Sequence, residues 1–303
     1  MLINRRPDGT RIKVPGFTKL MPILMPTRTE STIYMEQEVE LNDTMAFISE
    51  WNDNRPEGRR RLTIMQVLLT AMARAVVERP WINRFVSNFR HYQRNNISFS
   101  FVTKKSLSDA GKEVNVTMPF RPGDTLDSVN ERFTQFVEQA KSDDGNKNDE
   151  DVDAFEKLPV FLLRIILAIL KFMDRHNWMN AAMIKLLPFY CTAFLTNVGS
   201  LKIDAPLHHN FELGNTGLFI SLGQIKRQKA LDDNGNVYER CWVKITYTFD
   251  ERIVDGIYSG RTIKLIKYLT ERPQLLVDKP EYSQEQLDEL KLTEKGWKLW
   301  MTH

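Results

Sequence analysis

A hairpin pattern in the last third of the chain places the strongest constraint on the fold. Residues 229–249, KALDDNGNVYERCWVKITYTF, carry Asn234-Gly235 between two segments with strand character. That dipeptide suits a two-residue turn in which both residues take positive φ, and strands joined so closely must pair antiparallel. Because two short apolar runs, AFLTNVGS and TGLFISLGQI, precede the hairpin, we expect this third of the chain to supply much of a β-sheet.

Helix and strand patterns follow one another through the rest of the chain. Residues 33–41 alternate apolar and charged side chains, which predicts a strand with one charged face. Apolar residues three and four apart predict a buried helix from Thr63 to about Glu78, ended by Pro80. We expect paired strands in NNISFSFVTKK and KEVNVTMPF, and helices at about 42–52, 125–140, 158–173, 178–187, 256–270 and 284–300, the last opened by a capping box of Ser283 and Gln286. The mixture predicts an α/β fold, an α+β two-layer sandwich.

Composition excludes several classes of protein. With 303 residues, 42% of them hydrophobic and 27% charged, the chain is neither collagen-like, nor wholly disordered, nor a disulfide framework. Its net charge of +3 is too small to imply a nucleic-acid partner without a clustered basic patch. Cys191 and Cys241 are too few for a Cys-rich zinc site, and the N-terminus lacks a signal-peptide pattern. We therefore expect a cytoplasmic protein that binds no metal.

The most apolar stretch runs from Leu158 to Met173. Its length of about 16 residues is below the roughly 20 that a membrane-spanning helix needs, and Arg164 and Lys171 interrupt it. We expect no integral membrane segment. Two interpretations stay open: a helix that is buried on most sides or packed at a subunit contact, and a helix in peripheral contact with a membrane.

Two charged segments are assigned to the periphery. Residues 1–18 look like a basic arm with a turn at Asp8-Gly9, either a solvated terminal strand at a sheet edge or a phosphate-binding arm. Residues 142–153 are acidic and almost free of large apolar side chains, which predicts a mobile loop inside one domain. The loop lacks the spacing of an EF-hand, so we do not expect it to bind a metal.

Polar residues at strand ends are the candidates for chemistry. The run FDERIVDG, residues 249–256, puts Glu251 and Asp255 one helical turn apart between a strand and a helix. Their alternative role is to complement the dipole of the following helix. His208 and His209 are adjacent, so in a strand they would point to opposite faces and could not bind one metal together. Thr196 supplies a hydroxyl after an apolar run.

The order and spacing of several segments resemble a known family. LTIMQVLLTAMARAVVERPWINRF, AFLTNVGS, GLFISLGQI and VKITYTFDERIVDG are similar to the catalytic core of dihydrolipoyl acyltransferases of 2-oxo acid dehydrogenase complexes, and more distantly to chloramphenicol acetyltransferase. The resemblance covers about residues 20–277. It implies a chloramphenicol acetyltransferase-like fold with a large mixed sheet and flanking helices, a homotrimer, and a substrate channel at each subunit interface. It also implies coenzyme A as co-substrate.

The resemblance assigns roles to individual residues. The family's closing signature is D-H-R-x-x-D-G, and Asp250, Arg252, Asp255 and Gly256 match it, while Glu251 stands at the position of the histidine that acts as general base. Asp255 would hold the local loop. Thr196 would stabilise the oxyanion with Asn197 beside it. His208, His209 and Arg252 are assigned to substrate binding because the matching segments border the channel.

Glutamate at the histidine position leaves two functions open. The ordinary pKa of a glutamate lies about two units below that of histidine. This difference adds roughly 3 kcal/mol to the free energy of deprotonating a thiol, but burial can recover most of it by raising the glutamate pKa. One hypothesis is therefore a stand-alone acyltransferase with Glu251 as base, with His208 or His209 as the substitute base. The other is a catalytically degenerate trimer that binds or scaffolds.

The resemblance also sets the expected domain organisation. We expect an acyltransferase-like domain over residues 1–277 and a C-terminal helical extension over 278–303 that favours an isolated trimer. We expect no lipoyl domain before the core, so the acyl donor would be acyl-coenzyme A or an acylated carrier protein.

Overall fold

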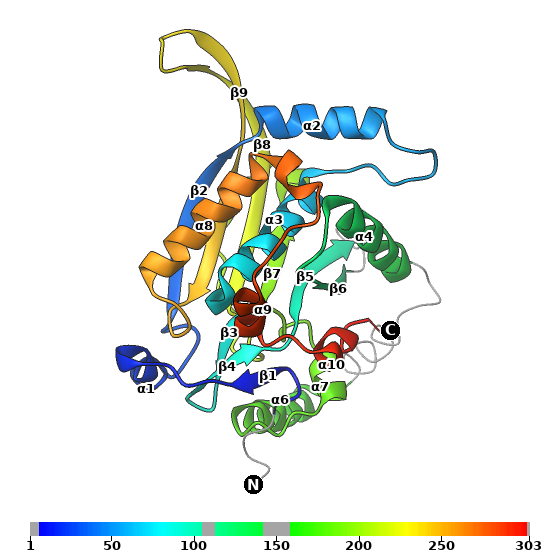
Figure 1. Ribbon diagram of the computed structural model, residues 1–303. Helices are drawn as coiled ribbons and strands as arrows, with labels where there is room; N and C mark the ends of the chain where they lie inside the picture. The colour runs from blue at the N-terminus through cyan, green and yellow to red at the C-terminus, as the bar shows by residue number, and fades with distance from the viewer. Residues whose placement is uncertain (1–5, 105–112, 142–157, 302–303) are drawn as a thin grey trace.

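The computed structural model describes residues 6–104, 113–141 and 158–301 (Figure 1). Its centre is a mixed sheet of six strands in the order β2-β9-β8-β7-β5-β6. The strands are β2 (Thr32–Glu40), β5 (Ile97–Lys104), β6 (Glu113–Phe120), β7 (Ala193–Asn197), β8 (Leu218–Leu231) and β9 (Val237–Asp250). Strand β7 pairs parallel with both β5 and β8, whereas all the other neighbours are antiparallel. The expected large mixed sheet is confirmed.

Helices pack against one face of this sheet and form the second layer (Figure 1). Helix α3 (Ile64–Glu78) is buried along almost its whole length, because its apolar residues face both the sheet and helix α8 (Gly256–Thr270). Thr63 and Gln66 cap its N-terminus reciprocally. Around these two helices lie α2 (Asn42–Asp53), α4 (Leu126–Lys141), α9 (Gln284–Leu290), α10 (Glu294–Lys298) and the 3-10 helices η2 (Pro80–Asn83) and η4 (Pro273–Leu276). The two-layer α/β architecture follows from this single covered face.

A second, smaller sheet lies at one end of the molecule. It has the order β1-β4-β3, with β1 (Gly9–Arg11), β3 (Arg84–Ser87) and β4 (Arg90–Arg94) all antiparallel. Near it lie the 3-10 helix η1 (Gly16–Lys19), α1 (Met21–Leu24), α6 (Val160–Arg175) and α7 (Ala181–Lys185) (Figure 1). The last 3-10 helix, η3 (Gly199–Leu201), follows β7. The N-terminal segment thus forms an edge strand from Gly9 onward.

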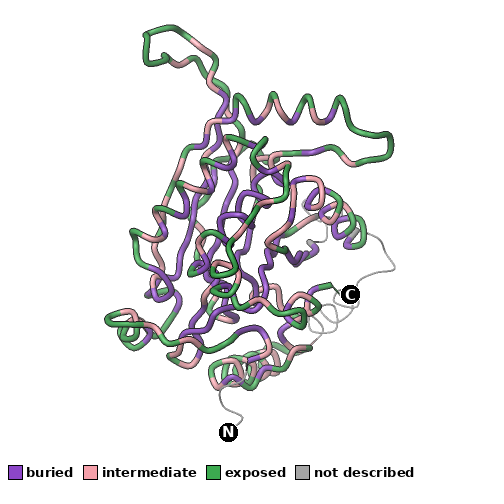
Figure 2. Tube along the Cα trace, in the orientation of Figure 1, coloured by how far each residue is buried: buried purple, intermediate pink, exposed green. Residues whose placement is uncertain are grey.

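Strands β8 and β9 continue beyond the sheet as a projecting two-stranded ribbon. Strand β2 pairs with β9 only as far as Trp242, and β7 pairs with β8 only as far as Leu222, so residues 228–240 pair with one another alone. Figure 2 shows this ribbon almost entirely exposed or intermediate, in contrast to the buried strands of the main sheet.

The turn of that ribbon differs from the expected two-residue turn. Gly235 has a φ of 81°, but Asn234 is not in the left-handed region. The Gly235 amide donates to the Asp232 carbonyl at 3.0 Å, and the Asp232 carboxylate accepts the amides of Asn234 and Asn236 at 2.9 and 2.8 Å. These side-chain hydrogen bonds stabilise a longer turn that needs only one left-handed residue, so the predicted turn type was wrong.

Two helix predictions also need correction. The last helix is not continuous from 284 to 300, because Lys291 takes a left-handed φ of 52° and Thr293 caps a separate helix α10. The capping box of Ser283 and Gln286 is confirmed. Helix α6 forms where predicted, but none of its residues is buried, so the interpretation of a helix buried on most sides is wrong for a single chain.

Other expectations fall partly outside the described residues. The acidic segment 142–153, the turn at 109–111 and residues 1–5 of the basic arm lie there. Residues after 277 pack into the body of the molecule, since Leu290 belongs to the main apolar core and Trp300 packs with Met179, Ile184 and Tyr190. Cys191 and Cys241 are both buried, and neither forms a disulfide. No helix in the described ranges has the length and apolar character needed to cross a bilayer.

Buried charges fasten the N-terminal segment to the small sheet. Asp8 accepts hydrogen bonds from Arg6 Nε at 2.9 Å and from Asn215 Nδ2 at 2.6 Å, and Arg94 lies 3.9 Å away. All these groups are buried, so Arg6 is not part of a solvated basic arm. Burial acts to raise the pKa of the Asp8 carboxyl, but the positive charges and hydrogen bonds of Arg6 and Arg94 hold it below its ordinary value.

We predict that Asp8→Asn lowers the free energy of unfolding by about 3–5 kcal/mol, because it leaves the buried Arg94 guanidinium without its nearby counter-charge and leaves Arg6 with Asp174 alone. Urea denaturation at neutral pH measures the loss. The matched control is Asp204→Asn, which removes a carboxylate from an exposed ion pair with Lys226 and should change stability very little. Equal effects of the two variants would contradict the prediction.

Candidate functional site

A row of hydroxyl side chains crosses the sheet face that the helices leave uncovered. Thr196 of β7 pairs with Ser221 of β8, and Ser221 pairs with Thr246 of β9. Side chains of paired residues point to the same face, and their neighbours Leu195 and Ile220 face the helices in the main core. Thr196, Ser221 and Thr246 therefore lie side by side on the opposite face, one on each of three adjacent strands.

Two of these hydroxyls are free to bind a ligand. Ser221 is buried, and its Oγ has no hydrogen-bond partner within the described chain. Buried polar atoms without a partner are rare and often mark a functional site. Thr196 is half-buried and its hydroxyl makes no hydrogen bond to the described residues. The sequence analysis identified Thr196 but missed Ser221, whose only sequence signal was a lone polar residue in the apolar run GLFISLGQI.

Residues 203–210, which we term the strap, run across this face beside the hydroxyl row. The amide of Gln224 donates to the Ile203 carbonyl at 2.9 Å, and Thr246 donates to the Pro206 carbonyl at 2.6 Å. The Thr248 hydroxyl donates to the carbonyl of His208. Gly223 permits this close approach, because a Cβ there would lie 2.6 Å from the backbone nitrogen of Ala205.

The strap brings His208 next to the hydroxyl row. Its ring stacks on Phe219 with centroids 3.9 Å apart and planes inclined by 5°. Phe219 precedes Ser221 by two residues on the same face, a step of about 7 Å. Nδ1 of His208 lies 2.7 Å from the His209 carbonyl, which can only accept, so Nδ1 carries a hydrogen and Nε2 is the nitrogen left to face a ligand.

The histidine pair does not sit in a strand, contrary to expectation. The rings of His208 and His209 stack on one another with centroids 4.8 Å apart, because the strap is irregular and does not alternate its side chains. Within the described residues, no group of three or more His, Cys, Asp or Glu side chains is placed to hold a metal ion.

The FDERIVDG segment forms a tight connection from β9 to α8. Arg252 returns to Asp250, donating from Nε to Oδ1 at 2.8 Å and from Nη2 to Oδ2 at 2.7 Å, and both side chains are buried. The Asp255 carboxylate caps α8 by accepting the amide of Tyr258 at 2.7 Å. The backbone amide of Glu251 donates to the Ser31 carbonyl at 2.8 Å, while its half-buried carboxylate has no hydrogen-bond partner in the described chain.

Two buried residues that the sequence analysis missed support this connection. Arg28 donates to the carbonyls of Thr216 and Gly214 at 2.5 and 2.6 Å, which holds the chain entering β8. His91 Nε2 donates to the carbonyl of Arg252 at 2.8 Å. Burial lowers the pKa of His91, so this ring is neutral at pH 7. Their only sequence signal would have been a charged or titratable residue beside a predicted strand.

The structure separates the predicted site residues into two groups. Thr196 is level with Thr246 in the sheet, whereas Glu251 lies five residues further along and two strands away. Strand geometry puts them roughly 15–20 Å apart. Thr196 and His208 therefore share one face, while Glu251, Arg252 and Asp255 gather at the end of β9. Asn197 lies beside Thr196 but is exposed, and its Oδ1 accepts the Gly199 amide at 3.0 Å.

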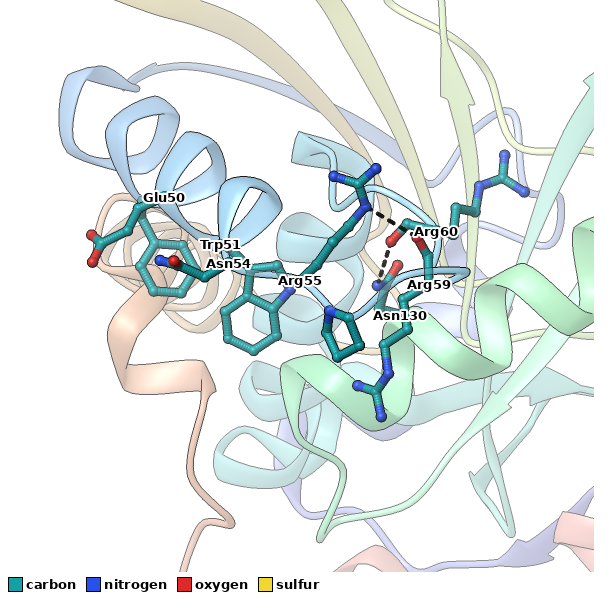
Figure 3. A pocket seen from close by; sticks show the side chains of 9 residues that line it. Glu50, Trp51, Asn54, Arg55, Arg59, Arg60 and Asn130 are labelled. Carbon is teal, nitrogen blue, oxygen red and sulfur yellow. Dashed lines mark hydrogen bonds between the residues drawn. The ribbon is translucent and has the colours of Figure 1, made fainter.

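Cavities lie at both ends of the sheet. One of about 370 Å³ lies against Arg252, and Arg28, Asp174 and Glu212 also line it. Another, of about 330 Å³, is lined by Trp51 and by arginines of the 55–61 loop (Figure 3). The second cavity is remote from Glu251, since β2 begins beside Glu251 and ends where α2 starts.

The arginines of the second cavity are largely engaged. Arg59 pairs with Asp127 at 2.5 Å and with Glu131 at 3.0 Å. Arg55 donates to the carbonyl of Asn52 in α2 and to the carbonyl of Arg59, the second of which Figure 3 shows. The charge of Arg59 is therefore compensated, whereas Arg55 and Arg60 form no ion pair within the described chain.

Solved structures share this fold. A probable dihydrolipoamide acetyltransferase from Listeria monocytogenes 4b F2365 matches with a TM-score of 0.55 and 14% identity, over 87% of this chain and 95% of that chain. The truncated catalytic core of a 2-oxoacid dehydrogenase multienzyme complex from Thermoplasma acidophilum gives 0.52 and 12%, over 87% and 99% of the two chains. A chloramphenicol acetyltransferase gives 0.52 and 13%, over 88% and 99%.

These likenesses confirm the expected fold. The chain has the chloramphenicol acetyltransferase-like fold of acyltransferase catalytic cores. At the level of sequence, no model of a known protein family matches and no curated protein matches.

We predict that the Asp250–Arg252 pair makes the protein sensitive to acid. Burial acts to raise the pKa of Asp250, but the hydrogen bonds and charge of Arg252 hold it below its ordinary value. The stabilisation is complete above the unfolded pKa of about 4 and is lost as the pH falls through the lower folded pKa. Urea unfolding between about pH 7 and pH 3 measures this loss.

The matched variant for this test is Asp250→Asn. It should cost about 3–5 kcal/mol of unfolding free energy at pH 7, since it leaves Arg252 buried without its counter-charge. It should also flatten the acid dependence relative to the wild type. A variant as acid-sensitive as the wild type would contradict a contribution from this pair.

Proposed function

We propose that the protein is a cytoplasmic homotrimeric acyltransferase that moves an acyl group between coenzyme A and an acceptor. The observation that carries the proposal is the pair of hydroxyls of Thr196 and Ser221, which have no hydrogen-bond partner among the described residues and lie beside His208 on one sheet face. The acyltransferase fold supports it, as does the retention of four residues of the D-H-R-x-x-D-G signature.

The hydroxyls would act on the tetrahedral intermediate. The acceptor's nucleophilic atom attacks the thioester carbonyl carbon, and the carbonyl oxygen becomes an oxyanion that accepts hydrogen bonds from Thr196 and Ser221. A base takes the acceptor's proton. As the carbon–sulfur bond breaks, the protonated base returns that proton to the coenzyme A thiolate. No metal takes part in this scheme.

Two residues compete for the role of base. Glu251 lies too far from Thr196 of its own chain, so it would serve the Thr196 of a neighbouring copy in a channel between subunits. His208 would serve Thr196 of the same chain, with the unprotonated Nε2 that its hydrogen bond to the His209 carbonyl leaves free.

The remaining site residues have supporting roles in the proposal. Asp255 and Asn197 hold the turns beside Glu251 and Thr196. Arg252 borders the cavity of about 370 Å³, and His209 extends the strap surface, so both would contact substrate at its edges.

Coenzyme A binding is the first test. Calorimetry on the full chain, with the mass of the trimer confirmed by light scattering, should show coenzyme A and acetyl-coenzyme A binding in the micromolar range. The absence of heat at millimolar ligand would contradict acyl transfer and favour a catalytically degenerate trimeric scaffold of the same fold.

The second test separates the two bases. Release of the free coenzyme A thiol from acetyl-coenzyme A, screened against thiol, alcohol and amine acceptors, should fall about 100-fold in Thr196→Val and at least tenfold in Ser221→Ala. If Glu251 is the base, the rate of thiol release should fall at least tenfold in Glu251→Gln and change little in His208→Gln. If His208 is the base, the rate should fall in His208→Gln and change little in Glu251→Gln. His176→Gln, remote from the hydroxyl row, is the control.

Mixed trimers add a test of the interface. Glu251→Gln and Thr196→Val subunits, co-expressed with different tags and purified on both, should regain roughly one third of wild-type activity if one copy completes its neighbour's site. Full activity of Thr196→Val, with its folding checked by urea unfolding, would overturn the proposed site.

A further inference from the structure

Apolar side chains gather at the end of the molecule opposite the projecting ribbon. The η1–α1 segment, the tip of the β3–β4 hairpin and α6 lie together there (Figure 1). They are neighbours in space, because Pro22 of α1, Phe89 of the hairpin and Lys171 of α6 line the same cavity. We term the surface formed by these three elements the base.

Helix α6 presents two different apolar faces. Leu170 and Met173 face inward and pack on the cluster of Met179, Ile184, Tyr190 and Trp300. Phe161, Ile165, Ile169 and Phe172 form an outward stripe, since they follow the three-and-four spacing of one helix face. Their exposed fractions are 67, 51, 52 and 51%, far above those of an ordinary apolar helix side chain. The inward face is accounted for by packing. In the outward stripe Phe172 contacts the rings of His176 and Trp178, but all four side chains remain at least half exposed.

The exposed stripe continues onto the other two elements of the base. Phe17, Ile23 and Leu24 of the η1–α1 segment are exposed. At the hairpin tip, Asn88 and Phe89 take left-handed φ values of 49° and 56°. A left-handed backbone conformation is unfavourable for an aromatic residue. At Phe89 this conformation leaves an apolar ring exposed to solvent. An exposed apolar surface contributed by three separate elements marks an interaction site.

Basic side chains border the stripe. Arg164, Lys171 and Arg175 follow α6 along one line beside the stripe, and none of them pairs with a carboxylate in the described chain. The Arg175 guanidinium lies 5.5 Å from the centre of the Phe89 ring. Apolar and aromatic side chains flanked by unpaired cations are the pattern of helices that lie in the headgroup region of a membrane.

We propose that the base binds the surface of a lipid bilayer that contains anionic lipids. Helix α6 lies in the plane of the interface, its stripe enters the acyl-chain boundary, and Arg164, Lys171 and Arg175 meet the lipid phosphates. A two-fold contact between copies of the chain is disfavoured, because pairing α6 with α6 would bring these like charges together. An anionic surface would neutralise them instead.

Vesicle flotation tests the proposal on the full chain. The wild type should float with vesicles of phosphatidylcholine containing about 30% phosphatidylglycerol, and binding should weaken as salt rises. Ile165→Gln/Ile169→Gln should lower binding at least tenfold, and Arg164→Gln/Lys171→Gln should remove the preference for anionic over pure phosphatidylcholine vesicles.

The projecting ribbon provides a matched control. Leu231→Gln/Val237→Gln changes two apolar side chains that are 67 and 65% exposed at the opposite end of the molecule, and it should leave flotation unchanged. The wild type remaining unbound to anionic vesicles would overturn the proposal.

Light scattering tests whether a second copy of the chain, instead of a membrane, covers the base. If Ile165→Gln/Ile169→Gln lowers the oligomeric mass while wild-type protein does not float, the base is a contact between copies and the lipid proposal fails. The acyltransferase proposal stands or falls separately, because coenzyme A binding is measured without vesicles.

Discussion

The parallel pairing of β7 between β5 and β8 is the constraint on which the rest of the molecule depends. Parallel neighbours cannot be joined by a tight turn, so the chain must leave the sheet both before and after β7. Before β7 it passes through α4, α6 and α7, and after β7 it returns through the strap. The strap is thus a consequence of placing β7 parallel to β8 in the centre of the sheet.

The sequence predicted the elements with strong local patterns. Helix α3, with its three-and-four spacing and its Thr63 cap, and the paired strands β5 and β6 appear where expected. The order of motifs correctly indicated the fold. Thr196 was singled out as a hydroxyl after an apolar run, and the family resemblance assigned its oxyanion role.

What could not be predicted depends on contacts between distant residues. The burial of Ser221 without a partner arises from the strap, which comes from another part of the chain and leaves no periodicity. The place of His208 beside Phe219 has the same origin. The break at Lys291 follows from the hydrogen bond that the Thr293 amide donates to the Asn95 carbonyl. The exposure of α6 depends on how much of its surface other elements cover, which no local pattern encodes.

The projecting ribbon has a consequence for how this protein varies over time. Residues 228–240 pair only with one another, and a two-stranded ribbon contributes little to the stability of the sheet below it. Substitutions there escape the selection for folding that acts on β7 and α3. Substitutions in the ribbon therefore reflect the contacts that the ribbon makes in the cell, whereas substitutions in the core mainly reflect the requirements of folding.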